Sequence, residues 1–333
     1  MGGERDLIIE LSKIFDRGPG QVICGIGDDA AVFGSEENYN LLWTIDSLIE
    51  GVHFDLTYTS LRLLGRKALA VNLSDIAAMG GEPQYALLAL GWPPARDLQG
   101  ALELARGMQE MAQEHNTAII GGDTVGSSQG LTLSLTVLGR VKPNELLRRD
   151  SAQSGDLIYV TGSLGQAAAG LEILRHGFEL SEDAKLPLLQ CFLDPRPEVA
   201  AGRVLAQHHL ATSLIDLSDG VASDLYQICL RSQVGAVVEA ERVPIIPSVR
   251  KVAALTGKDP LDLALKGGED YLLLFTSSPD KKYEMQRFFA QANLPEPWCI
   301  GSIVSGKEVR LRLPTTEVEI SGTGFDHFPA STP

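Results

Sequence analysis

The chain has 333 residues, which is long for a single hydrophobic core, so the sequence predicts two domains. Its 44% hydrophobic and 21% charged residues are typical of a soluble globular enzyme. The formal net charge of −15 argues against a nucleic-acid or anionic-membrane partner, because both select clustered Lys and Arg. A polyanionic substrate would therefore need metal ions that screen the repulsion.

The first half of the chain predicts strands that alternate with helices. In chain order we expect a helix over 6–16, strand segments in 21–33 and 40–48, a helix over Ser60–Met79, a strand at 85–93, a helix over Leu98–His115, and strands at 117–124 and 131–141. The last of these strands alternates apolar and polar residues with period 2, which indicates a half-buried strand. The order β-β-α-β-α-β-β is typical of an α+β sandwich with helices on one face of the sheet.

The polar stretch 142–156 has no periodicity and predicts a domain boundary, so we divide the chain into 1–145 and 146–333. The second part predicts an α/β domain. Its expected helices are 166–176, Glu198–His209, Ala222–Ser232 and Lys281–Ala292, and its expected strands are 156–162, 235–240, 271–276, 299–304, 308–313 and 317–320.

Cysteine usage and the N-terminus predict a cytoplasmic location. The N-terminal MGGERDLIIELSKIF has the pattern of a charged amphipathic helix, not of a signal peptide. No apolar stretch approaches the roughly 20 residues that span a bilayer. Four cysteines without a CxxC pair favour reduced thiols over a zinc site or a disulfide framework: Cys24, Cys191, Cys229 and Cys299.

Six short apolar or Gly-capped runs end in acidic residues. This pattern is typical of a buried strand or helix that ends with a carboxylate at the rim of a cleft. One such ending is an ordinary turn, but six of them suggest that carboxylates converge on hard cations, which prefer oxygen ligands. The acidic residues are Asp28, Asp29, Asp46, Asp75, Asp123, Asp216, Asp219, Glu269 and Asp270.

Asp75 is the most informative of these residues. The helix that begins at Ser60 places Asp75 on one stripe with Leu64, Ala68 and Val71. A carboxylate in an apolar stripe costs several kcal/mol to desolvate unless a cation meets it. A partner Lys or Arg, or a position near solvent, is the alternative, but AVNLSDIAAMGG offers no basic residue within a helical turn. A metal ligand is the favoured interpretation.

The other acidic motifs each have an ordinary alternative. GIGDD at 25–29 is compatible with a hairpin turn, and GGD at 121–123 with a simple loop or with a loop whose amides approach a phosphate. Asp219 in DLSDG precedes a helix and is compatible with a cap. Arg149 is a plausible phosphate clamp or a solvated loop arginine. His53 is the histidine placed next to the acidic residues.

The absence of several well-known sequence motifs limits the types of reaction that the site could catalyse. The sequence contains no GxxxxGK[ST] P-loop, no HRD–DFG kinase set, no GxGxxG after a strand and no GxSxG nucleophile elbow. A site with many carboxylates, glycine-rich approaches and no nucleophile suits Mg²⁺-dependent chemistry on a nucleoside triphosphate.

Taken in order, the motifs resemble one family. GIGDDAAV, TIDSLIEGVHF, ALAVNLSDIAAMGG, IIGGDT, IDLSDG, GGEDY and GTGFDHF together are similar to thiamine-monophosphate kinases, over nearly the whole chain. That family belongs to a superfamily with aminoimidazole ribonucleotide synthetase and selenophosphate synthetase. The resemblance implies transfer of the γ-phosphoryl group of ATP to thiamine phosphate, by direct in-line transfer assisted by several Mg²⁺ ions. It also implies an N-terminal domain that dimerises through its sheet into a β-barrel, beside a C-terminal α/β domain.

The resemblance also implies roles for individual residues. Catalysis would fall to Asp46, Asp75 and Asp123. Thiamine phosphate would meet His53, Glu269 and Phe325, and whether Glu269 meets the thiazolium or the aminopyrimidine stays open. ATP would contact Gly122, Asp123, Arg149 and Ser218. The Mg²⁺ ligands would be Asp29, Thr44, Ile45 through its carbonyl, Asp46, Asp75, Asp123, Asp216 and Asp219.

Two rival hypotheses remain from the sequence. One is a superfamily relative that uses ATP to activate an amide or a selenide. The other is a non-catalytic protein that binds divalent cations or nucleotides, in which the acids are structural.

Overall fold

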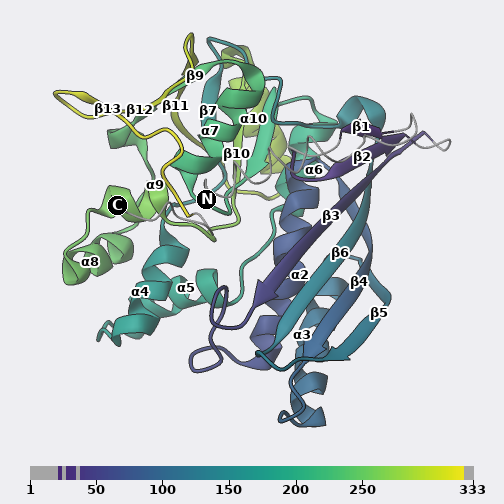
Figure 1. The fold of residues 1–333 in the computed structure, drawn as a ribbon. Helices are drawn as coiled ribbons and strands as arrows, with labels where there is room; N and C mark the ends of the chain where they lie inside the picture. The colour runs from purple at the N-terminus through teal and green to yellow at the C-terminus, as the bar shows by residue number, and fades with distance from the viewer. Residues whose placement is uncertain (1–21, 25–27, 35–37, 326–333) are drawn as a thin grey trace, which may run out of the picture.

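The computed structural model describes residues 22–24, 28–34 and 38–325. The helix expected over 6–16 lies outside the described residues. Two sheets, each with its own helices, make up the described part, and helix α2 (Leu61–Ala78) lies between them (Figure 1).

The N-terminal sheet has six strands in the order β1-β2-β3-β6-β4-β5. Only the pair β4 and β5 is parallel, so the sheet is mixed. The strands are β1 (Val22–Cys24), β2 (Ala31–Gly34), β3 (Asn40–Ile49), β4 (Glu82–Trp92), β5 (Ala118–Gly126) and β6 (Thr132–Val141).

Helices α2 and α3 (Leu98–Glu114) cover one face of this sheet (Figure 1). Along β3 the residues at even positions from 40 to 48 face these helices, whereas those at 43, 45, 47 and 49 lie exposed on the outer face. The local sequence fixes both helix starts: Ser60 accepts a hydrogen bond from the Leu63 amide, and Asp97 from the Gly100 amide. The described strands of one chain form no closed barrel.

The second sheet has seven strands in the order β13-β12-β9-β11-β7-β10-β8. It is antiparallel except for the pair β9 and β12. Its strands are β7 (Leu157–Val160), β8 (Ser213–Asp216), β9 (Gly235–Glu239), β10 (Leu273–Ser277), β11 (Trp298–Val304), β12 (Val309–Arg312) and β13 (Glu317–Glu319). The helices around it are α4 (Gln166–His176), α5 (Glu182–Leu193), α6 (Val199–Gln207), α7 (Val221–Ser232), α8 (Pro247–Thr256), α9 (Pro260–Lys266) and α10 (Lys282–Gln291). The two-domain mixed α/β fold that the sequence predicts is confirmed, whereas dimerisation of the N-terminal sheet into a β-barrel stays a prediction.

Three helices and one strand were not expected from the sequence. Helix α5 contains Pro187, which reads as a helix breaker, and α8 and α9 are short helices that begin with a proline. Strand β8 has only four residues, and all of them are buried. Burial against the rest of the domain, rather than local preference, stabilises these elements.

The environment of α2 differs from the single apolar stripe that the sequence suggests. Thirteen of its 18 residues are buried, among them the polar residues Lys67, Asn72 and Ser74. One side of α2 packs on the N-terminal sheet, and another contacts α6 and β8 of the second domain. The helix therefore lies between the hydrophobic cores of the two domains and packs against both.

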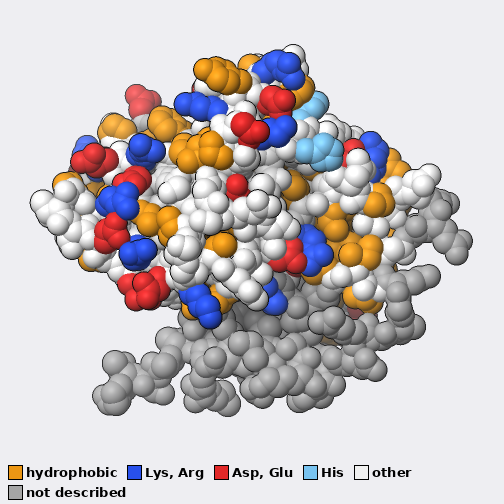
Figure 2. Space-filling model, turned by 90° about the horizontal axis from the view of Figure 1, so that it is seen from above, with side chains coloured by type: hydrophobic (Ala, Val, Ile, Leu, Met, Phe, Trp, Pro, Cys, Tyr) orange, Lys and Arg blue, Asp and Glu red, His pale blue; other side chains and the backbone are white. Residues whose placement is uncertain are grey.

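Two surface properties complete the description. None of the described helices is both long and apolar enough to cross a membrane. On the face seen in Figure 2, Lys and Arg are interspersed with Asp and Glu and form no broad basic patch, in accord with the net charge of −15.

Candidate functional site

A large cavity of about 1240 Å³ lies where the two domains meet. Strand β3 and helix α2 line it on one side, and α4, α9 and two loops of the second domain on the other. Nine residues that the sequence assigns to the site line it: Ile45, Asp46, His53, Asp75, Asp216, Ser218, Asp219, Glu269 and Phe325. The structure thus brings together side chains that are up to 280 positions apart (from 45 to 325).

Where Asp75 and Asp216 line the cavity, carboxylates from three separate segments of the chain converge. Asp29, Asp75 and Asp216 each offer an oxygen, and these oxygens lie within 4.8 Å of one another. Thr44 donates a hydrogen bond to Asp75, and the Ser74 hydroxyl donates one of 2.7 Å to Asp216. These hydroxyls fix the orientation of the carboxylates.

Burial and mutual repulsion disfavour the charges of these carboxylates. Burial, followed by Asp46, Asp216 and Asp29, raises the pKa of Asp75 well above its usual value. The pKa of Asp216 is raised in the same way, by burial and then by Asp29. Burial also raises the pKa of Asp46 to about 6, against the effect of its hydrogen bond with Asp75. A bound cation would relieve this repulsion.

Arg149 is the cation that touches this cluster. Its Nε donates a 3.0 Å hydrogen bond to Asp29, and its guanidinium lies 3.7 Å from Asp28. Burial works against its charge, but Asp29 and Asp28 outweigh burial and raise its pKa. The sequence leaves a phosphate clamp and a solvated loop arginine open for Arg149, and the structure places its side chain, 18% exposed, beside the acidic cluster.

The donor set of the cluster fits a hard divalent cation. It consists of carboxylate and hydroxyl oxygens without sulfur or imidazole, the chemistry that Mg²⁺ and Ca²⁺ select. One arginine leaves several buried carboxylates uncompensated, so the residues present fit a metal better than a purely structural ion-pair network.

The loop 267–271 supplies the opposite wall of the cavity. Gly268 allows a close approach, because a Cβ there would lie 2.4 Å from the Ser218 carbonyl oxygen. The Glu269 amide then donates to that carbonyl at 2.8 Å, and the Tyr271 amide to Leu217 at 2.9 Å. Glu269 and Tyr271 both have left-handed backbones, with φ of 68° and 47°, and both line the cavity. Backbone strain of this kind is typical of functional sites.

Asp270, between them, has a different role from the other acidic endings. It accepts hydrogen bonds from the Gly165 and Ala167 amides, at 2.7 and 3.0 Å. It therefore caps the N-terminus of α4 and does not join the carboxylate cluster.

Gly122 and Asp123 do not join the cluster within one chain. Both lie on β5, three strands away from β3. Asp123 pairs with Ala89 across the sheet and is exposed on its outer face, where it lines a separate hollow of about 270 Å³. Ile45 borders the inter-domain cavity, but the residue is 65% exposed and its side chain stands on the outer face of the sheet.

His53 and Phe325, which the sequence analysis assigns to thiamine phosphate, also line the cavity. His53 accepts a hydrogen bond of 3.1 Å from the Ile49 amide through Nδ1. Phe325, at the end of the described chain, is half exposed, and its amide donates to the Asp219 carbonyl at 3.3 Å.

Comparison with known proteins identifies the family. The models of the AIR synthase related protein, N-terminal and C-terminal domains, match residues 27–141 and 153–314. A thiamine-monophosphate kinase of Haemophilus influenzae is 37% identical over 333 residues, with 99% of each protein covered. The chain belongs to the thiamine-monophosphate kinase family. This confirms the family that the sequence motifs indicate.

Solved structures of the family have the same fold. AaThiL complexed with AMPPCP and TMP superimposes with a TM-score of 0.84 at 30% identity, over 98% of this chain and 97% of that one. The thiamine-monophosphate kinase of Stenotrophomonas maltophilia K279a gives a TM-score of 0.76 at 36% identity, over 92% and 94%.

Three residues in or beside the cavity have no role in the prediction from sequence. Asp28 is one of the acidic endings and Tyr271 belongs to the GGEDY motif, but neither has an assigned role. Lys67 has no assigned role either. Its signal was present: on a helix that closes with AVNLSDIAAMGG, it stands one turn from Val71 on the side that carries Asp75.

Proposed function

We propose that this protein transfers the γ-phosphoryl group of ATP to thiamine phosphate and so forms thiamine diphosphate and ADP. The observation that carries the proposal is the full-length similarity to thiamine-monophosphate kinases, combined with the carboxylate cluster at the end of the inter-domain cavity. ATP is the co-substrate, in keeping with the ATP analogue in the AaThiL complex.

Seven residues of one chain would hold Mg²⁺: Asp29, Thr44, Ile45 through its carbonyl, Asp46, Asp75, Asp216 and Asp219. Bound there, Mg²⁺ would neutralise the charge that phosphate oxygens bring into an acidic cavity. The hydroxyls of Thr44 and Ser74 keep the carboxylates oriented. Asp29, Thr44 and Asp216 are buried, so these groups are held in position before the substrates arrive.

The protein residues mainly bind and orient the two substrates. Arg149 and Ser218 would contact ATP, while His53, Glu269 and Phe325 would contact thiamine phosphate. The acceptor is an oxygen of a phosphate monoester, which is already anionic near neutral pH, so no strong general base is needed. Direct in-line transfer then depends on positioning and charge neutralisation.

We further propose that the working unit is a cytoplasmic homodimer formed through the outer face of the N-terminal sheet, with domains at 1–145 and 146–333. This face exposes large apolar side chains: Trp43, Ile45, Ile49, Tyr85, Leu87 and Val125. A contiguous exposed apolar surface on a sheet favours burial against a partner. A second copy would also bring its Gly122 and Asp123 toward the site, where they would act in catalysis and ATP binding together with Asp46 and Asp75.

The test is direct. The purified protein should convert thiamine phosphate to thiamine diphosphate with ATP and Mg²⁺, followed by chromatography of the thiamine products. Chelation of Mg²⁺ should abolish product formation. A folded protein that forms no thiamine diphosphate, but consumes ATP with an amide substrate of the superfamily, would refute the proposal.

A further inference from the structure

Lys67 is a buried lysine beside the substrate end of the cavity. Its side chain is only 5% exposed, and its Nζ lies 2.9 Å from Oε1 of Glu269. The same Nζ donates a 3.0 Å hydrogen bond to the Phe192 carbonyl and lies 4.0 Å from the centre of the Phe192 ring. A buried ammonium needs such partners, because desolvation would otherwise disfavour its charge.

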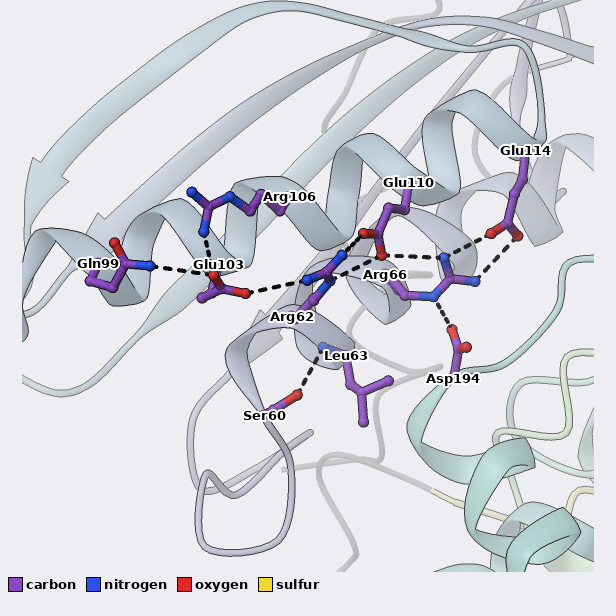
Figure 3. A network of polar contacts seen from close by, with 10 residues as sticks. All are labelled: Ser60, Arg62, Leu63, Arg66, Gln99, Glu103, Arg106, Glu110, Glu114 and Asp194. Carbon is purple, nitrogen blue, oxygen red and sulfur yellow. Dashed lines mark hydrogen bonds and ion pairs between the residues drawn. The ribbon is translucent and has the colours of Figure 1, made fainter.

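The neighbour of Lys67 fixes the same segment. Arg66 donates to Asp194, directly after α5, at 2.7 Å and to Glu114 of α3 at 2.8 Å (Figure 3). Arg62 extends this network through Glu110 and Glu103 (Figure 3). Two consecutive residues of α2 thus hold the end of α5, which carries Phe192 into the cavity wall.

Glu269 is held from two directions. Its amide donates to the Ser218 carbonyl, and its left-handed backbone sets the direction in which the side chain leaves the loop. Lys67 then holds Oε1. Among the described residues no hydrogen bond to Oε2 is formed, and the side chain is 26% exposed in the cavity. Within the described part of the chain, Glu269 therefore presents one acceptor oxygen, Oε2, that has no hydrogen-bond partner and is held in a fixed place.

We infer that Lys67 is a positioning residue: it holds Glu269 and cancels its charge, so that Glu269 accepts a hydrogen bond from the substrate's amino group. This inference rests on the proposed function and deepens it. Thiamine phosphate offers two features to a carboxylate, the amino group of its pyrimidine and the fixed positive charge of its thiazolium. A thiazolium beside Glu269 would also meet the ammonium of Lys67. The amino group needs only an acceptor, which Oε2 provides.

The first experiment separates positioning from stability. Lys67→Met should raise KM for thiamine phosphate by at least about 10-fold, because the acceptor is no longer held, with KM for ATP changed by less than about 2-fold. Lys281→Met is the matched control, since it removes a lysine–glutamate pair of 2.7 Å on the surface away from the cavity. Equal effects on both KM values, or none on that for thiamine phosphate, would overturn the inference.

The second experiment removes both charges, so that no buried charge is left unpaired if Lys67→Met alone fails to fold. The wild type should bind thiamine phosphate at least about 10-fold more tightly than its analogue with a 4-oxo group in place of the amino group. The double variant Lys67→Met/Glu269→Gln should lose most of this discrimination, because Gln can donate to the oxo group. Calorimetry measures both affinities.

The outcomes distinguish this inference from the proposed function. If the double variant still discriminates amino from oxo, but no longer discriminates thiazolium from a neutral ring, Glu269 is a counter-charge and the inference is wrong. If the wild type binds thiamine phosphate without forming thiamine diphosphate, the proposed function fails while the binding comparison still tests Lys67.

Discussion

The arrangement of the carboxylates in the site lowers the stability of the folded protein. Asp75 carries three other carboxylates as neighbours in addition to its burial, and each of them raises its pKa. Among the described residues, Arg149 is the only cation hydrogen-bonded to the cluster Asp29, Asp75 and Asp216. An arrangement that costs folding free energy persists when function requires it. This favours the enzyme hypothesis over a structural role for the acids.

The substitution Asp75→Asn tests whether the carboxylates serve function at the expense of stability. The substitution removes one buried like charge, so in the absence of Mg²⁺ the melting temperature should stay equal or rise. Turnover should fall by on the order of 100-fold or more, because the variant lacks a proposed Mg²⁺ ligand in the middle of the cluster. Calorimetry and the kinase assay measure the two effects. A large loss of stability with modest loss of turnover would instead support the non-catalytic hypothesis.

Glu198 offers a pH-dependent test outside the site. Burial alone raises the pKa of Glu198 to about 7, and the side chain pairs with no described residue. The native state therefore holds this proton more tightly than the unfolded chain, whose glutamate has a pKa of 4.5. Stability from this group is fully present below pH 4.5 and is lost as the pH rises through about 7.

The glutamine of a Glu198→Gln variant cannot ionise, so the variant should not lose stability as the pH rises through about 7. Above pH 7 the variant should be more stable than the parent by up to about 3 kcal/mol, and at pH 4 the two should be nearly equal. Urea unfolding at both pH values measures the difference. The surface variant Glu284→Gln is the control and should change stability little at either pH. A constant difference between pH 4 and pH 8 would contradict the assignment.

At the scale of elements, α2 and α3 approach closely through two glycines. A Cβ at Gly107 would lie 1.8 Å from the Arg62 carbonyl oxygen, and one at Gly65 would lie 2.0 Å from that of Leu104. Because backbone atoms cannot yield as a flexible side chain can, each helix needs its glycine there. The crossing holds α2, and with it Asp75, against the sheet.

Gly107→Ala should therefore destabilise the protein by about 2 kcal/mol or more through overpacking. This outweighs the roughly 1 kcal/mol by which alanine favours a helix over glycine. Gly100→Ala, on the same helix, is the control, because its Cβ would meet the end of the Leu61 side chain, which can move. Thermal unfolding of the two variants should separate them clearly. Equal melting temperatures would show that the helices move apart at little cost.

The elements that sequence predicts well are those with strong local signals. The cap at Ser60 and the left-handed Gly177 mark the ends of α2 and α4, and the alternation along β6 marks a half-buried strand. Helix α5 could not be predicted, because its interior Pro187 contradicts the local preference and only packing stabilises it.

Among the site residues, too, those with a strong local signal could be predicted and those that depend on tertiary contacts could not. Asp75 was predictable because a carboxylate in an apolar helix demands a cation. The partners of Arg149 could not be predicted, because Asp28 and Asp29 reach it only through the contact between the domains. Lys67 and Glu269 are 202 positions apart, and nothing local connects them. Which face of a sheet Asp123 occupies depends on strand order, which no single segment encodes.

At the scale of the whole molecule, one chain leaves its proposed site incomplete. Strand β5 lies three strand spacings from β3, roughly 14 Å away, and Asp123 faces the outer side of the sheet. Asp46, by contrast, lines the inter-domain cavity. The apolar outer face around Asp123 supplies the surface through which a second copy would bring the two together.

Complementation between two inactive variants tests this arrangement. Asp75→Asn and Asp123→Asn chains should each be nearly inactive alone, because every site lacks one carboxylate. In a mixed dimer, one site combines Asp75 of one chain with Asp123 of the other and is complete. After unfolding and refolding as a mixture, activity should recover to about a quarter of the wild-type value, since about half of the dimers are mixed and each has one complete site. Sedimentation of both variants should confirm dimers. If the mixture stays inactive while mixed dimers form, Asp123 acts within its own chain, because then no mixed dimer contains a complete site.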